Sequence, residues 1–123
     1  MKVIEGSKAK KTARTGGIFT GTVEITPLLD RDAGSKNYKA AIVTFPPGVR
    51  NHFHTHTQDQ VLYVVGGRGI VATEKNECVV NIGDIVMIPA GESHWHGATN
   101  ESEFSHLYVI HNDSKTSFSE SGQ

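Results

Sequence analysis

The chain has 123 residues and a formal net charge of −1, and it contains no apolar run near the roughly 20 residues of a membrane helix. This length suits one domain with its own core, and the balanced charge excludes the basic footprint of nucleic-acid binders. The N-terminus lacks the apolar stretch of a secretion signal, and the single cysteine, Cys78, cannot form an internal disulfide. We therefore expect a cytoplasmic protein that binds neither nucleic acid nor membrane, with Cys78 as a small structural residue.

In chain order, residues 1–17 are polar and lysine-rich, which predicts a flexible arm or an edge segment that orders on a partner. Segments of β-branched and apolar residues then alternate with turn residues. Strands are expected at 18–25 (ended by Pro27), 38–45, 61–65, 70–73, 78–82, 85–88, 93–97 and 104–111. The glycine-rich residues 66–69 predict a hairpin turn, and the serine-rich residues 112–123 predict a loose tail.

Many short strands, turns rich in glycine and proline, and no convincing helical pattern predict an all-β fold. An antiparallel sandwich or barrel formed by residues 18–111 satisfies this pattern as a single domain.

The most informative stretch carries three histidines at alternate positions, His52, His54 and His56, followed by Gln58 and Gln60. In an extended chain, residues two apart point to the same face. Three imidazoles on one face are costly to bury unless something coordinates them or accepts their hydrogen bonds. Because neutral imidazole is the commonest protein ligand of divalent metals, the pattern predicts a metal site.

This stretch resembles the first motif of the cupin superfamily, in which His-x-His and an acid lie between two glycines. The matching residues are Gly48, His54, His56, Gln60 and Gly67, with Gln60 standing where the family usually has glutamate. The neutral amide leaves a divalent site more positive than a carboxylate would.

A second stretch resembles the second cupin motif, a glycine, a proline, a glycine and a histidine at fixed spacing. Here these are Gly83, Pro89, Gly91 and His94, and Ala98 replaces the asparagine that usually closes the motif. The two motifs occur in the family's order and at its separation.

A second register of the first motif is open, because His52-x-His54 followed by Gln58 has the same internal spacing. That register would place Val65 where the closing glycine belongs, so the flanking glycines favour the other register and place His52 near the rim. The resemblance then implies four metal ligands, His54, His56, Gln60 and His94.

The resemblance implies the double-stranded β-helix, or jelly-roll barrel, with the metal site inside it. Small cupins of this kind usually pair through their sheets, so a homodimer is expected, and exchange of the N-terminal arm between subunits is an added option.

A narrower resemblance, to a group that includes manganese-dependent hydroxynitrile lyases, implies one divalent metal per chain. Manganese is favoured, and iron, nickel and zinc are alternatives. In that group the histidines near the substrate match His96 and His106, which are therefore the candidate catalytic residues. His96 has the same strand parity as His94, and an imidazole in an apolar cavity is expected to titrate near neutrality, as a general base requires.

Three functions follow as hypotheses. The first is a Lewis-acid lyase acting on a small cyanohydrin or hydroxy-carbonyl substrate, which the neutral Gln60 favours. The others are a metal-dependent dioxygenase or oxidoreductase, and a non-catalytic cupin that binds a metabolite.

Overall fold

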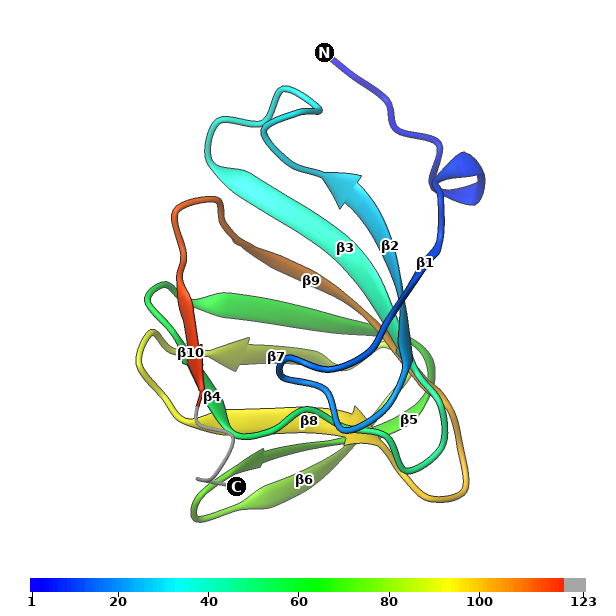
Figure 1. Cartoon of the computed structure of the whole chain (residues 1–123), viewed down its shortest axis with the longest axis vertical. Helices are drawn as coiled ribbons and strands as arrows, with labels where there is room; N and C mark the ends of the chain where they lie inside the picture. Colours follow the sequence, from blue (N-terminus) through cyan, green and yellow to red (C-terminus); the bar gives the residue numbers. More distant parts are fainter. Residues whose placement is uncertain (119–123) are drawn as a thin grey trace.

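The protein folds as an antiparallel β-sheet that curls into a half-barrel (Figure 1). The computed structural model describes residues 1–118. Within these residues, one 3₁₀ turn (η1, Gly6–Lys8) precedes ten strands. They are β1 (Thr12–Arg14), β2 (Val23–Leu29), β3 (Tyr38–Phe45), β4 (His54–His56), β5 (Gln60–Thr73), β6 (Glu77–Asn81), β7 (Ile85–Ile88), β8 (His94–Ala98), β9 (Phe104–His111) and β10 (Thr116–Phe118).

The strands follow the order β1-β2-β3-β9-β5-β8-β4-β10, and β6 and β7 also pair with β5. The long strand β5 connects the two walls of the half-barrel. Its first part pairs with β7 and β9, while residues from Arg68 to Thr73 pair with β6 and β8. This arrangement places β4 and β8, far apart in sequence, side by side.

The hairpin predicted at residues 66–69 is wrong, because β5 continues through all four residues. The strand bends there, with a register shift between Val64 and Gly66 and a φ of 65° at Gly67. A Cβ at Gly69 would lie 2.5 Å from the ring of Phe104. The glycines therefore let the strand bend and approach β9 closely instead of reversing it.

Several strand predictions are confirmed, and 38–45, 85–88 and 104–111 match β3, β7 and β9. The first strand was placed too early, since β2 begins at Val23 and continues through Pro27. A register shift beside Pro27 accommodates the proline, which cannot donate a regular ladder hydrogen bond. Cys78, expected to be a small structural residue, lies on β6 and is exposed.

Both ends of the chain contain strands that were not predicted. In the N-terminal segment β1 pairs with β2, so residues 12–14 form an edge strand. This resembles the edge segment given as the second alternative for residues 1–17, but it orders on a strand of the same chain. In the C-terminal segment, predicted to be loose, Thr116–Phe118 pairs with β4, and the rest of that prediction, 119–123, lies outside the described residues. Backbone pairing with a neighbouring strand orders these polar segments, which composition could not reveal.

The core consists of apolar side chains on the concave face of the sheet. Its buried members are Val23, Ile25, Ala41, Val43, Phe45, Val64, Val80, Ala98 and Phe104. The helices found in residues 1–118 include none with the length and apolar character needed to cross a membrane.

Candidate metal centre

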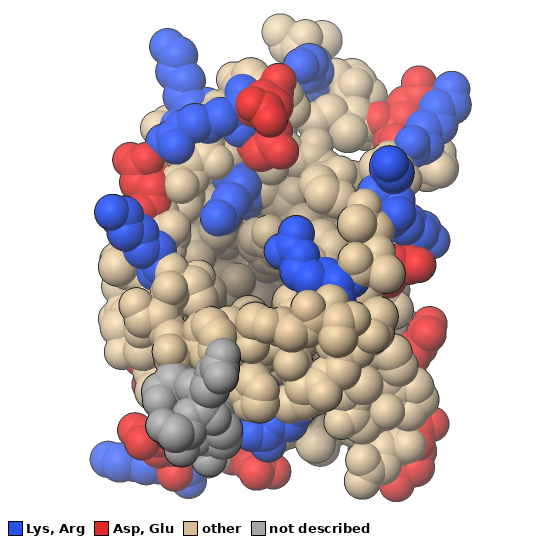
Figure 2. Space-filling view, viewed as in Figure 1, with Lys and Arg blue, Asp and Glu red and all other residues tan. Residues whose placement is uncertain are grey.

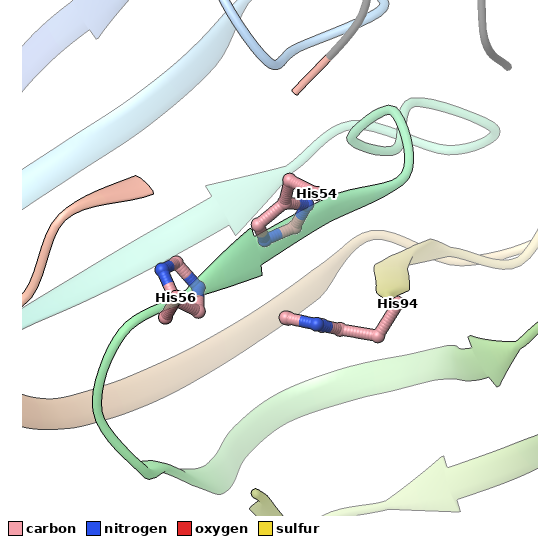
Figure 3. A group of neighbouring side chains, drawn as sticks. All are labelled: His54, His56 and His94. Atoms are coloured by element: carbon pink, nitrogen blue, oxygen red, sulfur yellow. The ribbon is translucent and has the colours of Figure 1, made fainter. Parts of the chain in front are cut away.

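Three buried histidines meet where β4 lies against β8. His54 and His56 are the two ends of β4, and His94 is the first residue of β8, directly opposite His54 in the strand pairing. One ring nitrogen from each of the three lies within 4.8 Å of the others, and Figure 3 shows the rings facing a common point. The two motifs predicted to meet do so, and the three histidines could hold a metal ion.

Backbone carbonyl groups fix the orientation of two of these rings. Nδ1 of His54 donates a hydrogen bond to the carbonyl oxygen of His52 at 2.7 Å, and Nδ1 of His94 donates to that of Glu92 at 2.9 Å. In a neutral imidazole a proton on Nδ1 leaves the lone pair on Nε2. Nε2 is therefore the ring atom of His54 and of His94 that is free to bind a metal ion. A hydrogen bond from the other ring nitrogen to a second group is usual in metal-binding histidines.

The third ring, His56, is held by a residue that sequence reasoning missed. Its Nδ1 lies 2.8 Å from Oγ1 of Thr116, which β10 brings directly opposite it. Thr116 lies in a serine-rich segment without any motif, so nothing in the sequence distinguished it. With Nδ1 engaged, Nε2 of His56 is buried and has no hydrogen-bond partner among the described residues, as is also true of Nε2 of His94.

Gln60, the predicted fourth ligand, is the first residue of β5 and lines the same cavity as His54 and His56. Its side chain is buried, and its Oε1 has no hydrogen-bond partner among residues 1–118. A buried amide oxygen without a partner is costly. The ring nitrogens and the amide oxygen that have no hydrogen-bond partner are therefore suitable ligands for a divalent metal ion.

His52 and Gln58, the members of the rejected register, lie outside the histidine group. Gln58 is exposed, and His52 is half-buried and contributes its carbonyl group rather than its ring. The histidines that cluster are those of the register that the flanking glycines favour.

The two candidate catalytic residues, His96 and His106, form a second buried pair in the same cavity. Their ring centroids lie 4.8 Å apart, and both nitrogens of each ring lack hydrogen-bond partners within the described part of the chain. Both rings pack on Phe45. The side chain of Asn51 accepts a hydrogen bond from the backbone N–H of His96 at 2.8 Å, which fixes this segment of β8.

Burial lowers the pKa of every one of these histidines, because it removes water from the charged form. The pKa falls to about 3 for His54, where the neighbouring His94 adds to burial, and to about 4 for His56 and His106. Burial lowers the pKa of His94, and it lowers that of His96 well below its usual value. The expected titration near neutrality is therefore wrong for His96 and His106, and all five rings are neutral at pH 7.

Four of these histidines, His54, His56, His96 and His106, line a cavity of about 350 Å³, within the usual range for small-molecule sites. Figure 2 shows a hollow in the face that is turned toward the viewer, with basic side chains at its edge. Apolar residues form much of the wall, among them Ile18, Phe19, Ile25, Val43, Phe45 and Ile110.

A family model described as a cupin domain matches residues 41–110. The (R)-mandelonitrile lyase of Granulicella tundricola is 39% identical over 92 residues, which cover 74% of this chain and 70% of that protein.

Solved structures share the fold. A cupin-like protein from Thermotoga maritima has a TM-score of 0.80 at 28% identity, with 90% of this chain and 87% of that chain covered. The polyketide cyclase RemF from Streptomyces resistomycificus has a TM-score of 0.85 at 18% identity, with 98% and 88% covered. At that identity, the second likeness supports the fold alone.

Proposed function

The chain belongs to the cupin superfamily, and on that basis we propose that it is a metal-dependent lyase of the hydroxynitrile lyase type. Its substrate would be a small cyanohydrin or a related hydroxy-carbonyl compound. One observation carries the proposal: a buried group of unpaired metal-donor atoms shares its cavity with a second pair of unpaired imidazoles.

We assign the metal site to His54, His56, His94 and Gln60. A divalent metal ion held there, with manganese favoured and iron, nickel or zinc as alternatives, would supply Lewis-acid polarisation of a substrate oxygen. All four ligands are neutral, so they leave the charge of the site uncompensated, whereas glutamate at position 60 would cancel one unit. A more positive site favours stabilisation of a developing anion over redox chemistry.

The second pair of histidines supplies the proton transfer. Burial lowers the pKa of His106 and of His96, so each ring is neutral at pH 7 and able to accept a proton. One of them accepts the proton of the cyanohydrin hydroxyl group through an unpaired ring nitrogen. The electron pair of the O–H bond then forms the carbonyl, and the carbon–carbon bond to the nitrile breaks, so that its electron pair leaves with cyanide. The histidine returns the proton to cyanide, and the products are an aldehyde or ketone and hydrogen cyanide.

The experiment is to strip the metal from the full chain, restore manganese and measure cleavage of mandelonitrile by the appearance of benzaldehyde. Loss of a general base costs about 10²–10⁴-fold in rate. The cleavage rate of His106→Ala, or that of His96→Ala if His96 is the base, should therefore fall by that factor while the metal content of the variant is unchanged. His111→Ala is the matched control, because His111 is on the same strand but does not line the cavity.

Wild-type protein that holds manganese and does not cleave mandelonitrile faster than buffer would contradict the proposal, as would full activity of both His106→Ala and His96→Ala. Oxygen uptake with catechol-like or diketone substrates after iron or copper is restored would instead favour the oxygenase alternative.

A further inference from the structure

Two basic side chains line the mouth of the cavity, Arg14 of β1 and Lys39 of β3. Directly paired residues of antiparallel strands share a face. Arg14 is paired with Val23, and Lys39 is paired with Ile110. Val23 and Ile110 are buried, so both cations lie on the concave face, toward the histidines rather than the outer surface.

Neither cation is neutralised by the protein around it. Within residues 1–118, Arg14 and Lys39 take part in no ion pair, and no aspartate or glutamate lines the cavity. The cavity therefore has two cations and no carboxylate among its described lining residues, and an anion is the group that this arrangement attracts.

The charge of Arg14 also reaches the cavity wall. Burial is the main influence on the hydroxyl group of Tyr108 and raises its pKa. The positive charge of Arg14 opposes this rise, and the negative charge of Asp30, which does not line the cavity, adds to it. Tyr108 lines the cavity on the face of β9 that carries His106. Arg14 is thus close enough to interact with a ligand in the cavity.

On the basis of the lyase site proposed above, we infer that the substrate carries a carboxylate group that pairs with Arg14 and Lys39. Its hydroxyl or carbonyl oxygen lies at the histidines, and its apolar body packs against Phe45 and Ile25. The two oxygens of a carboxylate can accept parallel hydrogen bonds from the planar guanidinium group of Arg14, and its charge can also pair with the ammonium group of Lys39. The apolar wall and the small cavity favour a compact carboxylic acid over a larger anion.

The test compares the binding of three probes to the full chain by isothermal titration calorimetry. Mandelate supplies the carboxylate, mandelamide is its neutral counterpart of nearly the same shape, and phenyl phosphate tests the other anionic group. Each probe is titrated into wild-type protein, into the double variant Arg14→Gln/Lys39→Gln and into the control Arg68→Gln/Lys75→Gln. The control removes the same charge, and neither of its residues lines the cavity.

We expect mandelate to bind wild-type protein about tenfold more tightly than mandelamide, as two partly screened charge pairs allow. This preference should disappear in the cavity double variant, persist in the control and weaken with added salt. Equal binding of mandelate and mandelamide, no binding of mandelate at millimolar concentration, or a preference unchanged in the cavity variant would overturn the inference. Tighter binding of phenyl phosphate than of mandelate would overturn the assignment of a carboxylate.

The titrations are made on metal-stripped and on manganese-loaded protein. Binding by the stripped protein is independent of turnover, so failure of the lyase reaction and failure of the anion preference are separate results. A preference that occurs only with manganese and survives in the cavity variant would show that the metal ion, not Arg14 and Lys39, recognises the carboxylate.

Discussion

His54 and His94 lie directly opposite one another on β4 and β8, with their ring centroids 4.2 Å apart. They lie 40 positions apart in the sequence. Their backbone pairing, rather than a flexible loop, sets the distance between the rings, and each ring is tethered through Nδ1 to a backbone carbonyl group. The site is thus preorganised, and a metal ion would meet donor atoms that are already oriented.

Removal of any one of the three histidines should abolish stable metal binding. Loss of groups that merely orient metal ligands costs about 10–100-fold in metal affinity, so His54→Ala, His56→Ala and His94→Ala should cost at least as much. His52→Ala is the control, because His52 contributes only its backbone carbonyl group to the site. Elemental analysis of the purified proteins measures the outcome, and wild-type metal content in His94→Ala would refute the assignment.

The neutral side chain of Gln60 should keep the net charge of the metal site more positive than a carboxylate would. Gln60→Glu adds a carboxylate, so the metal should be held more tightly. The site then stabilises a developing anion less well, and lyase turnover should fall roughly tenfold, which corresponds to about 1.4 kcal/mol of transition-state stabilisation. Competition with a chelator gives the metal affinity, and benzaldehyde release gives the rate. A variant that turns over faster than wild type would contradict this role.

The buried histidines should make the metal-stripped protein sensitive to acid. Burial lowers the pKa of His106 from 6.5 to about 4, so between these values the unfolded chain binds a proton that the folded protein does not. The contribution of neutral His106 to the free energy of unfolding is therefore fully present above pH 6.5 and is lost as the pH falls toward 4. The shift corresponds to a loss on the order of 3 kcal/mol for this residue.

Urea unfolding of the stripped protein at several pH values checks this prediction. His106→Gln removes one titrating group, so its free energy of unfolding should depend less steeply on pH, by up to about 1.4 kcal/mol per pH unit. Identical slopes for the variant and the wild type would show that His106 is not protected from protonation in the folded state.

The outer face of the sheet carries two cross-strand rows of apolar residues. One row consists of Ile42, Leu107, Tyr63 and Ile85, and the other of Ala40, Val109, Val61 and Met87. Ile85 and Met87 are 70% and 59% exposed, so β7 adds large apolar side chains to this outer face. A contiguous apolar face on a sheet is typical of a protein interface, and it supports the predicted homodimer.

Sedimentation velocity tests the dimer directly. Wild-type protein should sediment as a dimer, and Ile85→Lys should sediment as a monomer, because a buried unpaired charge is costly at an interface. Ile82→Lys is the matched control, since Ile82 is 66% exposed but lies in the turn between β6 and β7. A wild-type monomer at micromolar concentration, or a dimer of Ile85→Lys, would rule this interface out.

The sequence by itself determined which residues share a face and which belong to the site. Backbone geometry fixes the alternation of side chains along a strand, so His54 with His56, His94 with His96, and His106 with Tyr108 could be grouped from spacing. The glycines that flank the motif selected Gln60 over Gln58, and the all-β fold followed from the short strands and turns. All of this information is local in the chain.

Only the tertiary structure decided what surrounds those residues. Pairing between distant segments decides three features of the structure. It makes β5 continue through its glycines, brings Thr116 to His56, and places Arg14 on the concave face. The pKa of His106 was misjudged for the same reason, because desolvation depends on every neighbour that excludes water and not on the residue's own strand.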